Sequence, residues 1–354
     1  MKAQYLLTLL LLNLANMTFA ATCESTLASG QWSQTSTWIN CNGMVPQDGD
    51  SVIVNNGHTV ILDQNTALIE SLTVVGGGDI NVAATGFSIN TDADGADINL
   101  QNATIELSGD LTINANGHKI LLGSVDGAFD LTLNSSNETR FLGKIGGITE
   151  LTSLITDSPG TTVFADTSAG TSTPNLKVNG LIEFNDPMLI AQRVIFSGNN
   201  TSVYFNNTID SETTAKDLYI LASVNSTFIF NDDVGTNTRL GAIKITNNVS
   251  SMVVFNTENI LTSEFQWYTA HMLLKVPNVN LDSTSTGLSF LLQSPTVRSE
   301  VAGMSGLTVN TNGSTHISST IGDNNQALAH LNIANSISND LKSNSVTVID
   351  SITF

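Results

Sequence analysis

A short four-residue phrase recurs along this chain and constrains its fold more than any other feature. The phrase reads Leu, polar residue, apolar residue, Asn, and it occurs at 111–114, 131–134, 176–179 and 307–310. Apolar first and third positions around a polar second position are the period-two pattern of a strand with one buried face. The closing Asn suits a turn, because Asn tolerates left-handed backbone angles. The phrases predict many short strands that are separated by turns.

A longer spacing overlies the phrases. Leu151, Leu240 and Leu328 each follow an Ile-Gly or Val-Gly pair, and they lie 89 and 88 residues apart. Similar units at fixed spacing indicate stacked repeats. We therefore expect an all-β fold, a parallel β-solenoid of the right-handed β-helix type with about 22 residues per coil. A tandem of β-sandwich domains is the alternative, but no Pro-rich or charged linker separates the units.

The surface of this chain must be polar without being strongly charged. Charged residues make up 12% of the sequence, whereas 39 residues are Asn; globular domains carry roughly 25% charged residues. Lys plus Arg total 12 against 31 Asp plus Glu, so the net charge is −19. Nucleic acids and anionic lipids both attract clustered basic residues. The charge therefore excludes a nucleic-acid binder and disfavours docking on anionic lipid.

The first twenty residues have the features of a secretory signal peptide. Lys2 supplies a positive charge, residues 5–12 form an apolar core, and residues 18–20 place small side chains before a cleavage site. A membrane-anchoring helix is the alternative, but this stretch is short, and no later stretch approaches about 18 apolar residues. We expect cleavage after Ala20, a secreted or cell-surface location, and no transmembrane segment in the mature chain.

Two cysteines, Cys23 and Cys41, lie close to the expected mature N-terminus. In an oxidising compartment such a pair normally forms a disulfide. A metal site would need more ligands than two cysteines, and no His lies between them. We expect a structural disulfide that pins an N-terminal cap on the solenoid.

Two parts of the chain resemble known families. The cap sequence has two Trp in residues 30–38, then Cys41, Val45-Pro46, a Gly-Asp turn at 49–50 and strand-like segments at 51–54, 57–60 and 72–74. It resembles the G8-type domain. The later repeats, with residues 129–133, Gly146-Gly147 and 151–154, resemble secreted bacterial adhesins and autotransporter passenger regions. These features together predict a signal peptide at 1–20, a cap or G8-like module at 21–80, and solenoid repeats at 81–354.

Motifs that carry catalysis are scarce. The sequence has no G-x-S-x-G, H-E-x-x-H or phosphate-loop motif, so we assign no catalytic residue. Inverting β-helix hydrolases use grouped aspartates, and Asp92, Asp232 and Asp233 are the candidates for such a group. If these three converge in one groove, a carbohydrate-active enzyme becomes the better hypothesis.

Two other local patterns suggest binding. Asn90, Asp92, Asp94 and Asp97 place oxygen ligands at nearly alternate positions around Gly95, as a Ca²⁺ loop requires. Ca²⁺ is the only cofactor that the sequence suggests, and a solvated acidic turn is the alternative. Trp267-Tyr268 is a candidate platform for stacking on a sugar ring, although an aromatic pair also suits the core.

Three functions are compatible with this sequence. The first is a secreted or cell-surface, non-enzymatic β-solenoid that acts in adhesion or surface interaction, with glycans or host and cell-surface components as partners. The second is a carbohydrate-active β-helix enzyme, either a polysaccharide hydrolase or a lyase. The third is a purely structural surface component. The repeats, the polar surface and the lack of catalytic motifs favour the first.

Overall fold

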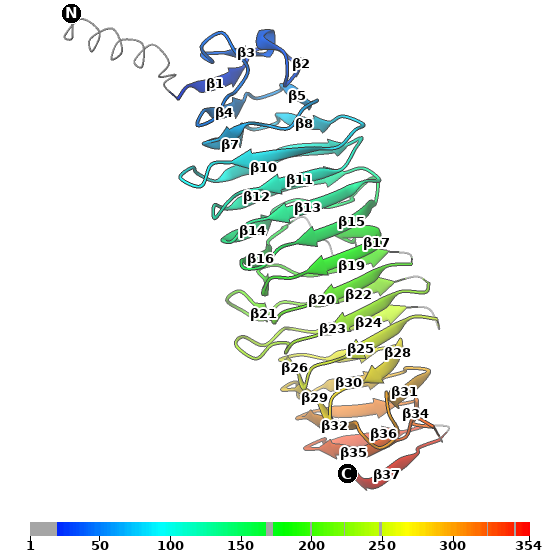
Figure 1. Ribbon diagram of the computed structural model, residues 1–354. Helices are drawn as coiled ribbons and strands as arrows, with labels where there is room; N and C mark the ends of the chain where they lie inside the picture. The colour runs from blue at the N-terminus through cyan, green and yellow to red at the C-terminus, as the bar shows by residue number, and fades with distance from the viewer. Residues whose placement is uncertain are drawn as a thin grey trace, which may run out of the picture.

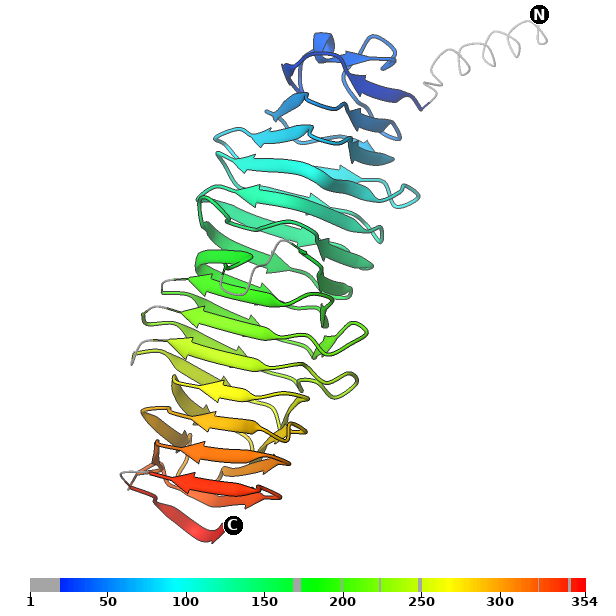
Figure 2. The ribbon, with the colours of Figure 1, turned by 180° about the vertical axis from the view of Figure 1, so that it is seen from behind.

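The computed structural model describes residues 20–167, 173–198, 200–222, 224–247, 250–323, 325–342 and 345–354. In these ranges the chain winds into an elongated parallel β-solenoid (Figures 1 and 2), which confirms the predicted fold class. The sole helical element within them is the 3₁₀ turn η1 (Thr35–Thr37). Residues 1–19 of the predicted signal peptide lie outside the described residues. None of the ranges contains a helix that is long and apolar enough to cross a membrane.

The strands form three rows that run along the solenoid, and residues of one row pair from turn to turn. Row 1 contains β1 (Thr22–Ser25), β4 (Ser51–Val54), β7 (Ser71–Val74), β10 (Ile98–Leu107), β12 (Ile120–Asp126), β14 (Glu138–Phe141), β16 (Thr161–Phe164), β18 (Met188–Ile190), β21 (Ile209–Ser211), β26 (Asn259–Thr262), β29 (Asn278–Ser283), β32 (Gly306–Thr311), β35 (Leu328–Ala334) and β37 (Val348–Thr353).

Row 2 shares β10 and β12 with row 1, because both strands bend around the corner between the rows. It also contains β2 (Ser29–Gln31), β5 (Thr59–Leu62), β8 (Asp79–Val82), the first part of β17 (Leu176–Phe184), β19 (Val194–Gly198), β22 (Leu218–Ala222), β24 (Ile243–Asn247), β27 (Gln266–Tyr268), β30 (Leu288–Leu292), β33 (Ser314–Ile317) and β36 (Ser338–Leu341).

Row 3 contains β6 (Leu68–Ile69), β9 (Phe87–Thr91), β11 (Leu111–Asn114), β13 (Asp130–Asn134), β15 (Leu151–Thr156), the second part of β17, β20 (Ser202–Phe205), β23 (Thr227–Phe230), β25 (Met252–Phe255), β28 (His271–Leu274), β31 (Thr296–Ser299) and β34 (Thr320–Ile321). The short strand β3 (Trp38–Ile39) pairs with β1 in the cap, and this is the one antiparallel pairing between the strands named here.

Turn length varies along the solenoid. Thr22 lies opposite Ser51 in the next turn, 29 residues on, whereas Ile120 lies opposite Thr139, 19 residues on. The predicted repeat of about 22 residues falls within this range. Parallel pairing in every turn excludes the alternative of tandem antiparallel β-sandwiches.

Alternate side chains of each strand point into a core that changes character along the rod. The first turns bury aliphatic residues, as in β4, where Val52 and Val54 are fully buried. From β14 onward, aromatic rings pack against one another in a continuous series, either stacked or edge to face, at centroid distances of 4.8 to 6.1 Å: Phe141, Phe164, Phe184, Phe205, Phe230, Phe255, Tyr268 and Phe290. The middle of the solenoid is thus held by aromatic packing.

Asparagines form ladders at the ends of the row 3 strands. The side-chain amide of Asn206 donates to Asn185 at 2.7 Å, and Asn231 donates in turn to Asn206 at 2.6 Å. Asn114 and Asn134, the closing residues of two predicted phrases, form a second ladder on Asn90. Each bond contributes about 1 kcal/mol, so the closing Asn ties neighbouring turns together as well as ending a strand.

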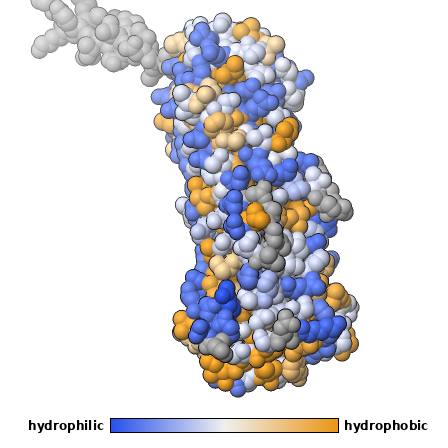
Figure 3. Space-filling model, turned by 90° about the vertical axis from the view of Figure 1, so that its right-hand side faces the viewer, coloured by the Kyte–Doolittle hydropathy of each residue, from blue (hydrophilic) through white to orange (hydrophobic). Residues whose placement is uncertain are grey.

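The two ends of the rod differ. At the N-terminal end Trp32 and Trp38 are 1% and 6% exposed and pack edge to face over the first turn. At the other end the last strand leaves Ile349, Ile352 and Phe354 exposed, and apolar residues gather at this end of the surface in Figure 3. The cap therefore covers the core at one end alone.

Candidate functional site

Row 2 presents a line of outward side chains in successive turns. Tyr219 of β22 lies opposite Lys244 of β24, Lys244 lies opposite Trp267 of β27, and Trp267 lies opposite Leu291 of β30. Parallel in-register pairing places equivalent side chains one strand spacing apart, about 4.8 Å. Because the solenoid repeats this spacing, the four side chains form a straight strip along the rod.

The strip is held together by contacts between its cationic and aromatic groups. The ammonium Nζ of Lys244 lies 4.5 Å from the ring centroid of Trp267 and 5.8 Å from that of Tyr219. Arg193 covers the Tyr219 ring from the preceding turn, with its Cζ 5.1 Å from the centroid. Cation–π contacts of this kind fix the rings against rotation. The aromatic faces are therefore preorganised at the surface.

Ion pairing orients one end of the strip. The guanidinium of Arg193 forms an ion pair with Asp217 at 2.5 Å, and this contact raises the pKa of Arg193 although burial alone would lower it. Burial and the charge of Asp217 raise the pKa of the Tyr219 phenol. The Tyr219 hydroxyl donates a hydrogen bond to Asp217, which also raises this pKa and holds the phenol in place.

A shallow depression of about 270 Å³ lies beside the strip. Phe265, Trp267, Leu288 and Leu291 line it, and Leu288 is 56% exposed. The depression is apolar, whereas basic groups lie at its Tyr219 end. We call the set Tyr219, Lys244, Phe265, Trp267, Leu288 and Leu291 the aromatic strip. Such a surface suits the apolar face of a ring that carries polar groups on its edge.

The predicted Trp267-Tyr268 platform is divided between two faces of β27. Trp267 points outward, whereas Tyr268 is fully buried and packs between Phe255 and Phe290. The Tyr268 hydroxyl donates to Oε1 of Gln266 at 2.9 Å, and burial raises the Tyr268 pKa. Trp267 is therefore the member of the pair that lies on the outer surface of the solenoid.

The predicted Ca²⁺ loop follows β9, and its members point to different partners. The Asn90 amide belongs to an Asn ladder, and Asp97 accepts a hydrogen bond from the backbone of Lys119 at 2.8 Å. Asp92 and Asp94 border a depression of about 250 Å³ together with Glu70. Calcium binding to this loop stays a prediction.

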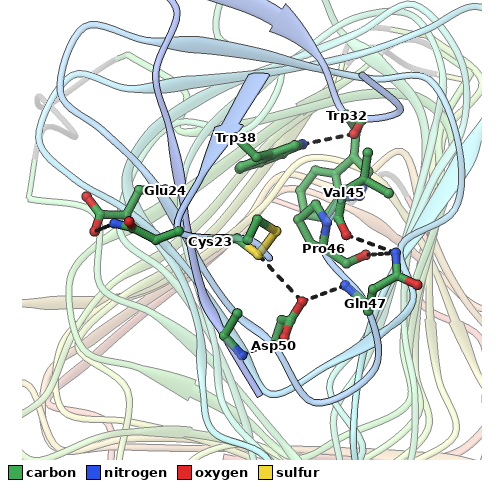
Figure 4. The surroundings of a disulfide bond; sticks show 11 residues. Cys23, Glu24, Trp32, Trp38, Val45, Pro46, Gln47 and Asp50 are labelled. Atoms are coloured by element: carbon green, nitrogen blue, oxygen red, sulfur yellow. Dashed lines mark hydrogen bonds between the residues drawn. A yellow bond between two sulfur atoms is a disulfide. The ribbon is translucent and has the colours of Figure 1, made fainter. Parts of the chain in front are cut away.

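The cap holds the closest group of metal-ligand side chains in the described ranges, namely Cys23, Cys41 and Asp50. The two cysteines form a disulfide, as predicted, and Figure 4 shows Asp50 beside Cys23 of this bond. Asp50 accepts hydrogen bonds from the backbone N–H groups of Ala21 at 2.7 Å and Gln47 at 2.8 Å. Disulfide sulfurs are not the thiolates that bind metals, so this group is a structural clamp.

The three aspartates considered for glycoside hydrolysis do not converge. Asp92 follows β9, and Asp232 and Asp233 follow β23, six pairings further along row 3. At about 4.8 Å per pairing the separation is roughly 29 Å, whereas paired catalytic carboxyls lie within about 10 Å. Burial alone would raise the Asp233 pKa, but hydrogen bonds from Thr257 and Asn259 lower it. The Asp233 carboxylate thus serves as a hydrogen-bond acceptor within the solenoid.

One buried carboxyl, that of Asp186, lies near a second carboxyl and was not predicted from the sequence. Asp186 is 1% exposed, accepts a hydrogen bond from the Thr162 hydroxyl at 3.3 Å, and has no partner for its Oδ1 atom within the described part of the chain. Burial and the charge of Asp157 raise the pKa of Asp186 from 3.8 to about 7. Asp157 and Asp186 each follow the end of a row 3 strand, but their equivalent positions can be recognised only when the turns of the solenoid are aligned.

Comparison with known proteins gives a family match for one region of the chain. Residues 37–141 match the family model of the G8 domain, which confirms the predicted resemblance of the cap. The match runs past residue 80, and β8 crosses the division expected there. No curated protein and no solved structure matches the chain.

Proposed function

We propose that this protein is an exported, non-enzymatic binding protein that acts in adhesion or surface interaction, with cell-surface carbohydrate as its ligand. The aromatic strip is the observation that carries this proposal. Apart from Phe265, its side chains lie on strands rather than on loops, and the rings of Tyr219 and Trp267 are in contact with Arg193 and Lys244. A preorganised surface loses little conformational entropy when it binds.

Carbohydrate fits the strip better than other ligand classes. Sugar rings have apolar faces that pack on aromatic rings and hydroxyl edges that accept hydrogen bonds from a group such as the Lys244 ammonium. A net charge of −19 repels polyanions. The strip is also too flat and open to enclose an apolar small molecule, which normally occupies a concave pocket.

A glycan array tests this proposal. Wild-type protein, Trp267→Ala and Tyr204→Ala would be compared, because Tyr204 is a partly exposed aromatic on β20 of row 3 and serves as the matched control. We expect binding of the wild type and of Tyr204→Ala, and a loss of about fivefold or more for Trp267→Ala, since stacking contributes about 1 kcal/mol or more. Equal binding by all three proteins would contradict the role of the strip. Absence of binding to every glycan would favour the purely structural alternative.

A further inference from the structure

The outward line of the aromatic strip continues toward the N-terminus of the solenoid. Pairing in row 2 places Thr104 opposite Ser124, and the bridge between Val125 and Ile145 places Lys144 next in line. The same line reaches Tyr219 through Asn175 and Ile195, which are 4% and 0% exposed. Row 2 thus carries two accessible surfaces on one line, separated by two covered positions.

The surface nearer the N-terminus is a polar groove of about 360 Å³. Its lining includes Gln101, Asn102, Thr104, Ser124 and Lys144. A bulge in β10 builds its wall. Leu100 lies opposite Leu122 and Thr104 lies opposite Ser124, so β10 has two more residues here than β12. Bulges re-aim side chains and are common beside binding sites. In this case the bulge exposes Gln101 and Asn102.

The floor of the groove is bare backbone at two glycines, Gly123 and Gly143. A Cβ atom on Gly123 would lie 2.3 Å from the carbonyl oxygen of Ala103, and one on Gly143 would lie 2.6 Å from the backbone of Gly123. Neither position therefore accepts a side chain. The groove runs over the backbone of successive turns, along the axis of the rod.

The polar side chains of the groove are available for a ligand. In the described ranges the side chains of Gln101, Asn102, Thr104, Ser124 and Lys144 form no hydrogen bond or ion pair with the protein. Elsewhere in the solenoid, by contrast, many amide and hydroxyl side chains are engaged in ladders and turn contacts, as in the ladder from Asn185 to Asn256. The groove offers amide, hydroxyl and ammonium groups at a spacing set by the turns.

We propose that this groove is a second carbohydrate subsite, and that one neutral polysaccharide chain lies along row 2 from the groove to the aromatic strip. This inference rests on the proposed function and specifies its ligand. Amides and hydroxyls pair with sugar hydroxyls, and one lysine in a strongly acidic protein does not select a polyanion. Ser124 and Trp267 are six pairings apart, roughly 29 Å, so an extended chain that passes over the covered positions Asn175 and Ile195 reaches both surfaces.

Two linked subsites make binding depend on chain length. A chain that reaches both surfaces binds with an avidity that exceeds either single affinity by about a hundredfold or more. A disaccharide occupies one surface at a time and gains nothing from the other. Loss of either surface should therefore weaken binding of the polymer strongly. Binding of the disaccharide should weaken only when the surface that it occupies is lost.

The test uses isothermal titration calorimetry with cellobiose, mannobiose, soluble mixed-linkage β-glucan and mannan as neutral probes, and polygalacturonate as the anionic probe. Ser124→Tyr fills the groove. Thr132→Tyr is the matched control, because Thr132 is a partly exposed residue of β13 on row 3. The double variant Gln101→Ala and Asn102→Ala tests the groove without added bulk, and melting curves confirm that each variant is folded.

We expect a neutral polymer to bind the wild type and Thr132→Tyr alike, and to bind both Ser124→Tyr and Trp267→Ala on the order of a hundredfold more weakly. Wild-type affinity in both groove variants would overturn the proposal that the groove is a subsite, but not the proposed role of the aromatic strip. A loss in the groove variants with none in Trp267→Ala would overturn the spanning chain and the role of the strip. Tighter binding of polygalacturonate than of any neutral polymer would overturn the ligand class.

Discussion

Replacing Asp186 by Asn is expected to remove a pH-dependent loss of stability from this solenoid. The Asp186 carboxyl is 1% exposed, close to Asp157, and has one hydrogen bond, from Thr162. Burial of a carboxylate with so few partners disfavours its charged form. Asn has nearly the same shape and still accepts from Thr162, but it cannot ionise.

The size and sign of the effect follow from the pKa of Asp186. The folded-state pKa is about 7 and the ordinary value is 3.8, so the two differ by about three pH units, at about 1.4 kcal/mol each. The folded state holds the proton more tightly than the unfolded state. This contribution is therefore complete below about pH 4 and is lost as the pH rises to about 7, by up to about 4 kcal/mol.

Urea unfolding between pH 4.5 and pH 8.5 measures this contribution as the difference between wild type and Asp186→Asn. Taking the difference cancels the titration of the other acidic residues. We expect the variant to gain stability relative to the wild type as the pH rises, and to level off above about pH 7. Asp157→Asn should move the midpoint to lower pH, because it removes a neighbouring negative charge. A difference that does not change with pH would refute this reasoning.

Three further predictions concern the cap and the ladders. The denatured, unreduced protein should contain no reactive thiol, and reduction of Cys23–Cys41 should destabilise the first turns by about 3 kcal/mol while amide exchange in the distal turns stays unchanged; two labelled thiols would contradict the disulfide. N-terminal sequencing of the exported protein should begin at Ala21, whose new ammonium group would pair with Asp50, and a start elsewhere would contradict the predicted cleavage. Asn231→Ala should lower the unfolding free energy by about 1 kcal/mol, because it breaks the ladder between Asn206 and Asn256; an unchanged urea midpoint would show that the ladder adds no stability.

The strands and the cap could be predicted because their signals are local. Alternation in residues 51–54 determines which side chains are buried, whatever the neighbouring turn contains. The pairing of Cys23 with Cys41 needed no knowledge of the fold, since no other cysteine exists. The division of Trp267 and Tyr268 between two faces follows from strand geometry, because neighbouring residues of a strand point to opposite faces.

The candidate site depends on register between turns, which local patterns do not determine. Turn lengths that vary between 19 and 31 residues prevent a fixed period from aligning Ser124 with Trp267 or Asp157 with Asp186. The ladder and stacking residues could not be predicted for the same reason. A Phe or an Asn at the end of a strand forms these contacts only when an equivalent residue lies beside it in the adjacent turn. The polar groove further requires the bulge in β10, for which the sequence carries no separate signal.

Intrinsic tryptophan fluorescence provides the most direct test that row 2 binds carbohydrate. The chain has three tryptophans; Trp32 and Trp38 are buried in the cap, and Trp267 lies in the aromatic strip. Titration with a soluble neutral polysaccharide should change the emission of the wild type saturably, and Trp267→Phe should abolish that change while preserving the signal of the cap. A change that persists in Trp267→Phe, or no change at any concentration of any neutral polymer that binds, would contradict the assignment of the ligand to this face.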